Sequence, residues 1–414
     1  MKSRNEKEKS TSSSSSSMSN KHSESKYLPP EVWTLIFLSL PAKTLLRFRC
    51  VCKSWCSIID NPRFVNMHFK LCKINNGNDN KLLLAFESLG YLQNEGCLLT
   101  TRDAETLEET DHIFRKSESY KYHIRGSCNG LLLVRQRSVY CNHKELRLWN
   151  PCIRKSLVIP TCPLCPHPLP LLDPGQYLFG FAPDIQDYKV VRLTSDYSLD
   201  KKSEKIYVAV YTLSNQQWTV RNDPINVTYA NSYNRIRLFF SLTTAVYFQG
   251  AAYWVVQNAK ERSGFLTYLA SFDFDKENIT FLELPFSLDK ARNSKLFPFL
   301  LGESLAVFTI SKVSSSIWVL DQDNKKRPWT LWFSGKSSLL GYLSFKVYDG
   351  SIKKIFFCEK DGGYFVYGKK AYNLASCEPQ ELDKSMSSFS ALETYSESLV
   401  LSKTYDARDL MVFL

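Results

Sequence analysis

The chain has 414 residues, of which 44% are hydrophobic and 14% aromatic, so it has ample apolar material for a folded core. Its formal net charge is +12. Most of that charge lies early: residues 1–26 hold six Lys/Arg and three Glu, and residues 27–73 hold seven Lys/Arg and two acidic residues. Nucleic-acid binders concentrate basic charge on their recognition surface, whereas the larger part of this chain is nearly neutral, so we expect no nucleic-acid partner.

Residues 1–26 are predicted to form a disordered tail. They are rich in Lys, Glu and Ser, with an unbroken serine run at 12–17. Such a composition cannot bury enough apolar surface to offset the entropy of ordering. The basic residues are interrupted by Glu6 and Glu8, which favours a solvated tail over a nuclear-import signal. The tail also lacks the apolar stretch of a secretory signal.

One uncharged run, 239–256, approaches the length of a membrane-spanning helix. It contains Ser, Thr, Gln and Gly and is rich in β-branched and aromatic residues, which predicts two buried strands. We therefore expect no membrane segment, and a protein of the cytoplasm, the nucleus or both.

The twelve cysteines have no regular spacing, which together with the lack of a secretory signal favours free thiols. Cys162, Cys165 and His167 have spacing that resembles a metal site. A closed zinc site needs four ligands, no second Cys or His pair follows at the required distance, and three prolines mark an irregular loop there. We expect neither a metal nor a cofactor.

A helical pattern begins abruptly after the tail and extends over residues 27–73. Pro29 and Pro30 suit a helix start, because the missing N–H costs nothing there. Val32, Ile36 and Leu40 then recur at i, i+4 and i+8, which predicts an apolar helix face.

Pro41 ends this helix and opens a second one, in which Leu45, Phe48, Cys52 and Trp55 fall at i, i+3, i+7 and i+10. Short helices in so few residues cannot build a large core alone. We expect this module to complete its core against a partner.

Residues 27–66 closely resemble the plant F-box in order, residue type and spacing. The motifs are Leu28-Pro29-x-Glu31 and Ile36-x-x-x-Leu40-Pro41-x-Lys43-x-Leu45-x-Arg47-Phe48-x-x-Val51-Cys52-Lys53-x-Trp55. The resemblance implies that eight residues pack on a Skp-type adaptor or support that surface: Leu28, Pro29, Ile36, Leu40, Pro41, Leu45, Val51 and Trp55. We assign Phe48 and Ile58 to the internal core. We assign Leu28 and Pro29 to the interface, because an apolar residue before a helix start has little else to bury against.

From Lys81 onward the pattern is of short strands and turns. Strand-type runs are 82–84, 131–134, 189–191 and 207–210, and the turns include Asn129-Gly130, Ser214-Asn215, 275–278 and Gly362-Gly363. Strand–turn–strand units recur roughly every 45 to 60 residues, as in four-stranded propeller blades, of which we expect six or seven. Trp149, Trp218 and Trp318 are expected in blade cores.

The last strand of this domain is predicted at 395–402, pairing near the first to close a ring, because an unpaired edge invites aggregation. A Gly-Gly doublet in every blade, as in strict kelch repeats, is absent; only Gly362-Gly363 fits.

The same region resembles the F-box-associated domain of plant F-box proteins. Kelch-type and S-locus F-box proteins both carry these motifs, so the sequence does not distinguish between the two subgroups. The resembling motifs include Gly126-Ser127-Cys128-Asn129-Gly130, Leu148-Trp149-Asn150-Pro151, Phe179-Gly180-Phe181-Ala182-Pro183 and Asp187-Tyr188-Lys189-Val190-Val191. The fold implied is mainly β: a small N-terminal helical F-box at 27–73, then a large β-propeller-like F-box-associated domain at 80–410. Substrate contacts are assigned to four loops, 105–111, 161–174, 195–204 and 221–237.

The resemblance implies a non-catalytic substrate adaptor of an SCF-type (Skp–cullin–F-box) ubiquitin ligase. It would bind the Skp-type adaptor, through it a cullin, and a protein target that the sequence does not identify. One alternative is an F-box scaffold that acts outside a cullin ligase. The other is a propeller enzyme, such as a copper–tyrosine oxidase or a hydrolase. The six histidines are scattered, none follows residue 167, and no Ser-His-Asp spacing stands out, which argues against the enzyme.

Overall fold

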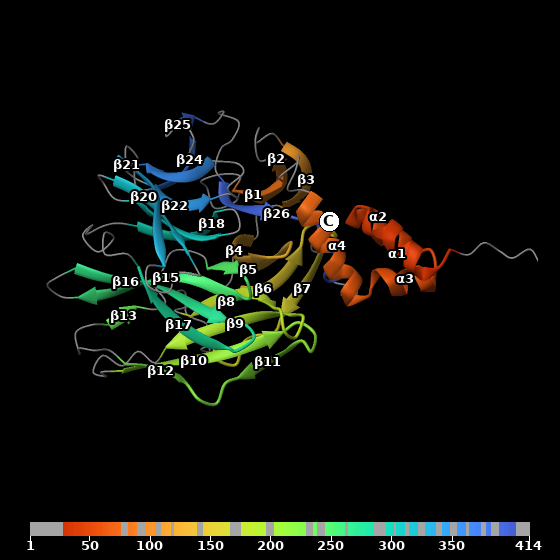
Figure 1. The fold of residues 1–414 in the computed structure, drawn as a ribbon, viewed down its shortest axis with the longest axis horizontal. Helices are drawn as coiled ribbons and strands as arrows, with labels where there is room; N and C mark the ends of the chain where they lie inside the picture. The colour runs from red at the N-terminus through yellow and green to blue at the C-terminus, as the bar shows by residue number, and fades with distance from the viewer. Residues whose placement is uncertain are drawn as a thin grey trace, which may run out of the picture.

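The computed structural model shows a group of helices attached to one side of a larger β domain (Figure 1). The described residues are 28–75, 82–88, 97–103, 109–116, 120–138, 144–165, 175–195, 203–228, 235–237, 245–260, 264–284, 295–301, 304–310, 314–321, 328–336, 342–347, 354–361, 364–373, 378–381 and 389–402. The tail expected to be disordered, 1–26, lies outside them, as does Gly362-Gly363.

The helical module comprises α1 (Pro30–Leu38), α2 (Ala42–Phe48), α3 (Lys53–Ile59) and α4 (Pro62–Asn75). As predicted, prolines stand at the starts of the first two helices: Pro29 and Pro41 occupy the positions before α1 and α2. Pro62 also begins α4. The prediction of a single second helix from Leu45 to Trp55 was wrong, because the extended backbone of Cys52, with φ −156°, separates α2 from α3. The helices pack around an aromatic cluster of Trp33, Phe37, Phe48 and Trp55. Its tightest pair, Trp33 and Trp55, has ring centroids 4.7 Å apart. Aromatic packing therefore supplies much of the core that so short a module needs.

Three antiparallel sheets of the β domain are built from residues 120–283. Their strands are β4 (Tyr120–Cys128), β5 (Leu131–Ser138), β6 (Lys144–Asn150), β7 (Lys155–Ile159), β8 (Gln176–Ala182), β9 (Asp187–Ser195), β10 (Ser203–Thr212), β11 (Gln217–Val220), β12 (Ile225–Thr228), β13 (Arg235–Arg237), β14 (Val246–Phe248), β15 (Ala251–Lys260), β16 (Gly264–Asp273) and β17 (Asn278–Glu283). The orders are β4-β5-β6-β7, then β11-β10-β9-β8 with β12 beside β10, then β13-β15-β16-β17 with β14 beside β15. The uncharged run 239–256 thus contributes strands, as predicted.

Three further sheets complete the domain. Their strands are β18 (Lys295–Leu301), β19 (Ser304–Ile310), β20 (Ser314–Leu320), β21 (Trp329–Lys336), β22 (Tyr342–Val347), β23 (Lys354–Asp361), β24 (Tyr364–Asn373), β25 (Glu378–Glu381), β26 (Phe389–Tyr395), β1 (Leu82–Ser88), β2 (Cys97–Asp103) and β3 (Glu109–Lys116). Two follow chain order, β18-β19-β20-β21 and β22-β23-β24-β25, and the third is β26-β1-β2-β3. The described residues therefore form six sheets, the lower of the two expected blade numbers.

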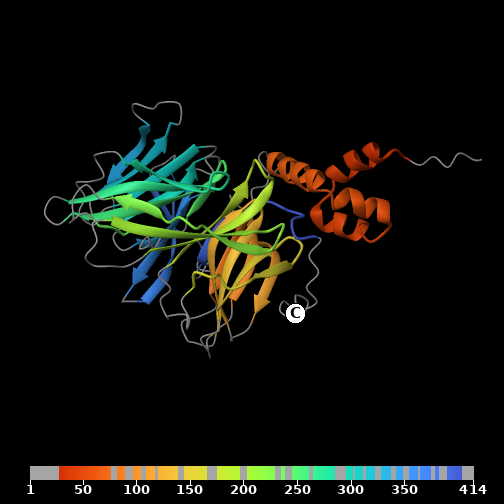
Figure 2. The ribbon, with the colours of Figure 1, turned by 90° about the horizontal axis from the view of Figure 1, so that it is seen from below.

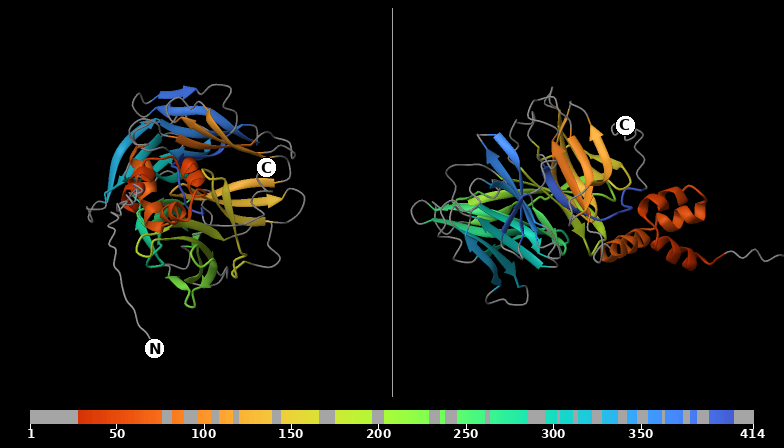
Figure 3. Two further views of the ribbon diagram at one scale, coloured as in Figure 1. Left: turned by 90° about the vertical axis from the view of Figure 1, so that its right-hand side faces the viewer. Right: turned by 90° about the horizontal axis from the view of Figure 1, so that it is seen from above.

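The ring closes through β26, which pairs antiparallel with β1 from Leu82 opposite Tyr395 to Glu87 opposite Phe389. The last strand thus pairs with the first, as predicted. Neighbouring sheets contact one another in sequence from the β4–β7 sheet to the sheet that contains β26, and the sheets surround a common axis (Figures 1, 2 and 3). The predicted position of the closing strand was wrong. The strand is 389–395, and residues 396–402 leave the sheet because their backbone groups bond to side chains elsewhere in the molecule.

The hairpin turns explain the recurring strand–turn–strand pattern. Asn129 and Gly130 have φ values of 50° and 76°, the pair of positive φ angles that a tight two-residue hairpin requires. In longer turns the side-chain oxygen of an Asn or Asp accepts a hydrogen bond from the backbone N–H two residues later. Asn215 accepts from Gln217 at 3.1 Å, and Asp273 accepts from Asp275 at 3.0 Å.

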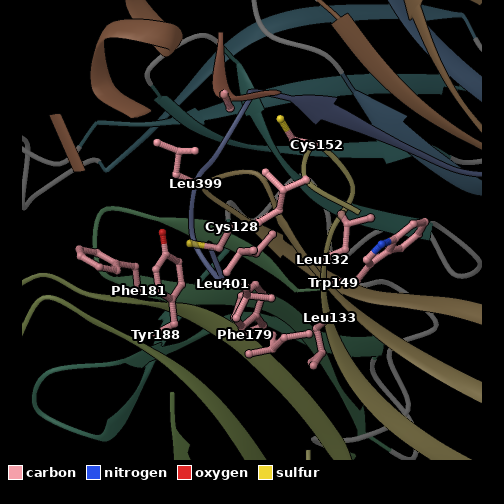
Figure 4. Close-up of a cluster of buried hydrophobic side chains, with 14 of the residues drawn as sticks. Cys128, Leu132, Leu133, Trp149, Cys152, Phe179, Phe181, Tyr188, Leu399 and Leu401 are labelled. Carbon is pink, nitrogen blue, oxygen red and sulfur yellow. The ribbon is translucent and has the colours of Figure 1, made fainter. Parts of the chain in front are cut away.

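One continuous hydrophobic cluster joins the helices to the β4–β7 sheet. Figure 4 shows part of this cluster in the β domain. Trp149 is buried in it, as predicted, whereas Trp218 and Trp318 are half-buried at cluster edges. The Trp218 indole N–H donates to the carbonyl of Pro160 at 2.7 Å, which keeps its polar edge near the surface. A separate cluster between the second and third sheets has the fully buried Trp254 at its centre.

No helix in the part of the chain that the structure describes is both long and apolar enough to cross a membrane.

Candidate docking surface

Helix α1 is apolar on two faces, and only one of them is buried. Phe37 and Leu38 are buried and Trp33 packs on the core, whereas Val32, Leu35 and Ile36 stand exposed. A helix that is hydrophobic all round needs burial on every side. The second face of α1 therefore has the composition of an interface and no cover within the described residues.

Five exposed apolar residues of the helical module form what we call the docking residues. Their side chains are exposed to the following extents: Leu28 44%, Val32 36%, Leu35 69%, Ile36 38% and Val51 61%. The first four lie at i, i+4, i+7 and i+8, so they share one side of α1 and the residues just before it. Val51 belongs to the turn between α2 and α3.

The structure divides the eight residues implied by the F-box resemblance into two groups. Those that are exposed, and so available to a partner, are Leu28, Pro29, Ile36, Pro41 and Val51. Leu45 is fully buried, and Leu40 and Trp55 are half-buried against the core, so these three can only support the surface from behind. Phe48 and Ile58 also pack against the core, as expected.

Val32 and Leu35 were missed by the sequence reasoning as docking residues. The apolar spacing places Val32 on an apolar face of the first helix, but it does not show whether that face points to the core or to solvent. Extending the series from Leu28 at steps of four and three residues would have identified both, because i, i+4 and i+7 lie on one side of a helix. Leu35 is the most exposed of the large apolar side chains in the module.

A partly buried ion pair fixes the turn that presents Val51. The Arg49 guanidinium donates to both carboxylate oxygens of Asp60, at 2.7 and 2.8 Å, and so joins the end of α2 to the end of α3. Such a bidentate pair restrains orientation as well as distance. The exposed charged side chains on these helices are mostly basic, Lys43, Arg47 and Lys53 against Glu31, so the surface is electrostatically suited to an acidic partner.

The cysteine motif behaves as buried packing. Cys162 and Cys165 are buried beside Ala209 and Trp218, and His167 lies outside the described residues. A hydrogen bond with Cys165, together with burial, raises the pKa of the Cys162 thiol. Among the residues that the structure describes, no group of three or more His, Cys, Asp or Glu side chains could hold a metal ion.

Three of the four loops assigned to substrate contact fall largely outside the described residues; their described parts are 109–111, 161–165, 195 and 203–204. The prediction of a loop over the whole of 221–237 was wrong, because residues 225–228 form β12, which pairs with β10, and residues 235–237 form β13, which pairs with β15. Their role in target binding stays a prediction.

The described residues thus form a helical module with an exposed apolar face, followed by a β domain of six sheets. Comparison with known families identifies both parts. Residues 27–66 match the F-box domain, and residues 67–401 match the F-box associated beta propeller domain. The chain belongs to the F-box-associated β-propeller family and is a substrate-recognition F-box protein of the plant type. The boundary between the two matches falls inside α4, so this helix is shared between the domains.

The similar curated proteins are also F-box proteins. An F-box/kelch-repeat protein of Arabidopsis thaliana is 26% identical over 258 residues, which cover 60% of this chain and 64% of that protein. A probable F-box protein of the same organism is 24% identical over 365 residues, covering 83% of this chain and 77% of the relative. Among solved structures, an oligogalacturonate lyase in complex with manganese gives a TM-score of 0.36 at 7% identity, covering 72% of this chain and 78% of that one. A likeness this low carries no argument about this chain.

Proposed function

We propose that this protein is the substrate-recognition subunit of an SCF-type ubiquitin ligase. The docking residues of the F-box would bind a Skp-type adaptor, which connects to a cullin, while the β domain would bind the target protein. The observation that carries the proposal is the exposed second apolar face of α1, because it lies within the matched F-box domain, which implies a Skp-type adaptor as the partner.

The proposed role is binding without chemistry. Holding a target beside a ubiquitin-loaded conjugating enzyme raises the effective concentration of the target's lysines, which is enough to accelerate transfer. We further propose that the protein acts in the cytoplasm, the nucleus or both, where this machinery and free thiols coexist. An F-box scaffold that never joins a cullin is the second candidate, and a cullin in the purified complex distinguishes the two.

The test is binding of the full-length chain to a purified Skp-type adaptor. Leu28→Ala combined with Leu35→Ala should weaken binding by about 30-fold or more, since central apolar interface residues cost about 2 kcal/mol or more when truncated. The matched control is Leu71→Ala with Leu331→Ala, which removes two exposed leucines outside the docking residues. Wild-type affinity in the first variant, or an equal loss in the control, would contradict the assignment of the surface.

A further inference from the structure

Residues 396–402, which we call the strap, lie between the F-box and the β domain. They follow β26 directly and pass over the hairpin turns of the β4–β7 sheet. Figure 4 shows Leu399 and Leu401 of the strap among side chains of the β domain such as Cys128 and Phe179. Both leucines are buried within the cluster that also contains the F-box core.

The β domain holds the backbone of the strap through two side chains. The buried Asn150 amide donates to the carbonyls of Ser398 and Val400, at 2.8 Å each. The Lys155 ammonium donates to the carbonyl of Ser402, also at 2.8 Å. Three carbonyl groups of a segment that makes no sheet are thereby satisfied, which accounts for the departure of the chain from the sheet after Tyr395.

The F-box is held by the side chains of the same strap. The Glu397 carboxylate accepts the backbone N–H of Ala42 at 2.9 Å, at the start of α2 and next to the exposed Pro41. The Ser402 hydroxyl donates to the Asp60 carboxylate at 3.4 Å, the group that also holds Arg49. The strap thus reaches the start of α2 and the end of α3, the two helices whose connecting turn carries Val51.

The backbone of the strap is shaped by these contacts. Leu401 has φ 73°, a left-handed conformation that is unfavourable for a residue with a Cβ, and the Ser402 N–H closes a turn on the carbonyl of Leu399 at 3.0 Å. A leucine keeps such a conformation only when its other contacts stabilise it. Here the burial of both Leu399 and Leu401 supplies that stabilisation.

We propose that the strap fixes the orientation of the F-box relative to the β domain, so that a target on the β domain is held at a set distance and angle from the adaptor. The chain passes from the F-box to the β domain between α4 and β1, and Asn66 of α4 donates to Gln186 of the β domain. The strap adds further non-covalent contacts at the other end of the sequence. The meaning for ubiquitin transfer rests on the proposed function, because effective concentration depends on how far the linked parts are free to move. The orientation itself can be measured without any partner.

The experiment measures the distance between two spin labels on the full-length protein by pulsed electron resonance. The labels are attached through a ketone-bearing amino acid placed at the exposed positions Ser57 in α3 and Lys205 in β10, so that the native cysteines stay unlabelled. Glu397→Ala with Ser402→Ala cuts the strap from the F-box, and Asn150→Ala cuts it from the β domain. The matched control, Glu283→Ala with Ser334→Ala, makes the same kinds of substitution at exposed positions of β17 and β21.

We expect a single narrow distance distribution in the wild type and the control, and at least a twofold broader one in both strap variants. A broad distribution in the wild type, or wild-type width in either strap variant, would overturn the proposal. If Asn150→Ala, which also loses its turn bond to Cys152, melts too low to assay, Lys155→Ala replaces it under the same criterion. Adaptor binding is measured on the same samples: failure of the wild type to bind would refute the proposed function and leave the strap result standing.

Discussion

Gly130→Ala tests how tightly the strap sits on the β4–β5 turn. An added Cβ would lie 2.4 Å from the carbonyl oxygen of Ser396 and 2.9 Å from the Cβ of Ser398. The positive φ of Gly130 alone costs an alanine about 1 kcal/mol. Moving the strap to relieve the contact costs a further 1 to 3 kcal/mol or so, as overpacking does. We therefore expect the free energy of unfolding to fall by about 2 to 4 kcal/mol.

Gly250→Ala is the matched control, because Gly250 has nearly the same φ, 82°, without the backbone contact. The nearest atoms to its added Cβ are in the ring of Pro183, 3.2 Å away, where a small shift relieves the contact. This variant should lose only the conformational cost of about 1 kcal/mol. The additional loss of unfolding free energy in Gly130→Ala then measures how tightly the strap packs against the β4–β5 turn.

Urea unfolding followed by tryptophan fluorescence measures both losses. Because a two-domain chain need not unfold in one step, helical circular dichroism is recorded in parallel and the two transitions are compared. The strap contacts both domains, so Gly130→Ala should shift both transitions. Equal midpoints for the two glycine variants would refute the reasoning that the strap is packed against Gly130.

Three further predictions concern charge and thiol chemistry. Arg49→Ala should lower the stability of the F-box by about 2 to 3 kcal/mol in thermal unfolding, because it leaves the largely buried Asp60 without its ion pair. The control Arg47→Ala, at an exposed position, should change stability by less than about 0.5 kcal/mol. Equal effects of the two substitutions would contradict this prediction. At pH 8 an alkylating reagent should modify Cys52 at least about tenfold faster than Cys72, measured by peptide mass spectrometry. The Ser54 hydroxyl lowers the pKa of the exposed Cys52 thiol, while burial raises the pKa of Cys72 to about 11, so less reactive thiolate forms there; similar rates would show that this reasoning fails. Once a target is known, its affinity for the protein should fall less than about tenfold between about 50 and 300 mM salt, since the β domain is nearly neutral; a loss of about a thousandfold would point to a strongly acidic partner.

Much of this architecture follows from local sequence signals. Prolines at helix starts and apolar residues at helical spacing predicted a helical module at this end of the chain, though not the division between α2 and α3. The Asn129-Gly130 pair predicted a hairpin, and both residues have the required positive φ. These features are readable in advance because each depends on a few neighbouring residues whose backbone preferences agree with the fold.

The tertiary structure decided what the local signals left open. Periodicity shows that α1 is apolar, but it cannot tell which of two apolar faces is buried, because both satisfy the same pattern. Packing of Trp33 and Phe37 against Trp55 settles that choice and leaves Leu35 outside. The candidate docking surface was therefore only partly predictable.

The strap shows the same limit in its strongest form. Residues 395–402 were predicted to form a strand, yet only Tyr395 of them pairs in the sheet. Asn150 and Lys155 bind the carbonyls of the strap, and Glu397 binds a helix start 355 residues earlier in the chain. Sequence by itself determined the helical module, the hairpins and the recurring strands, because those depend on near neighbours. The contacts of the strap with both domains depend on the closed ring, because ring closure brings the last strand beside the first and so places residues 396–402 between the two domains.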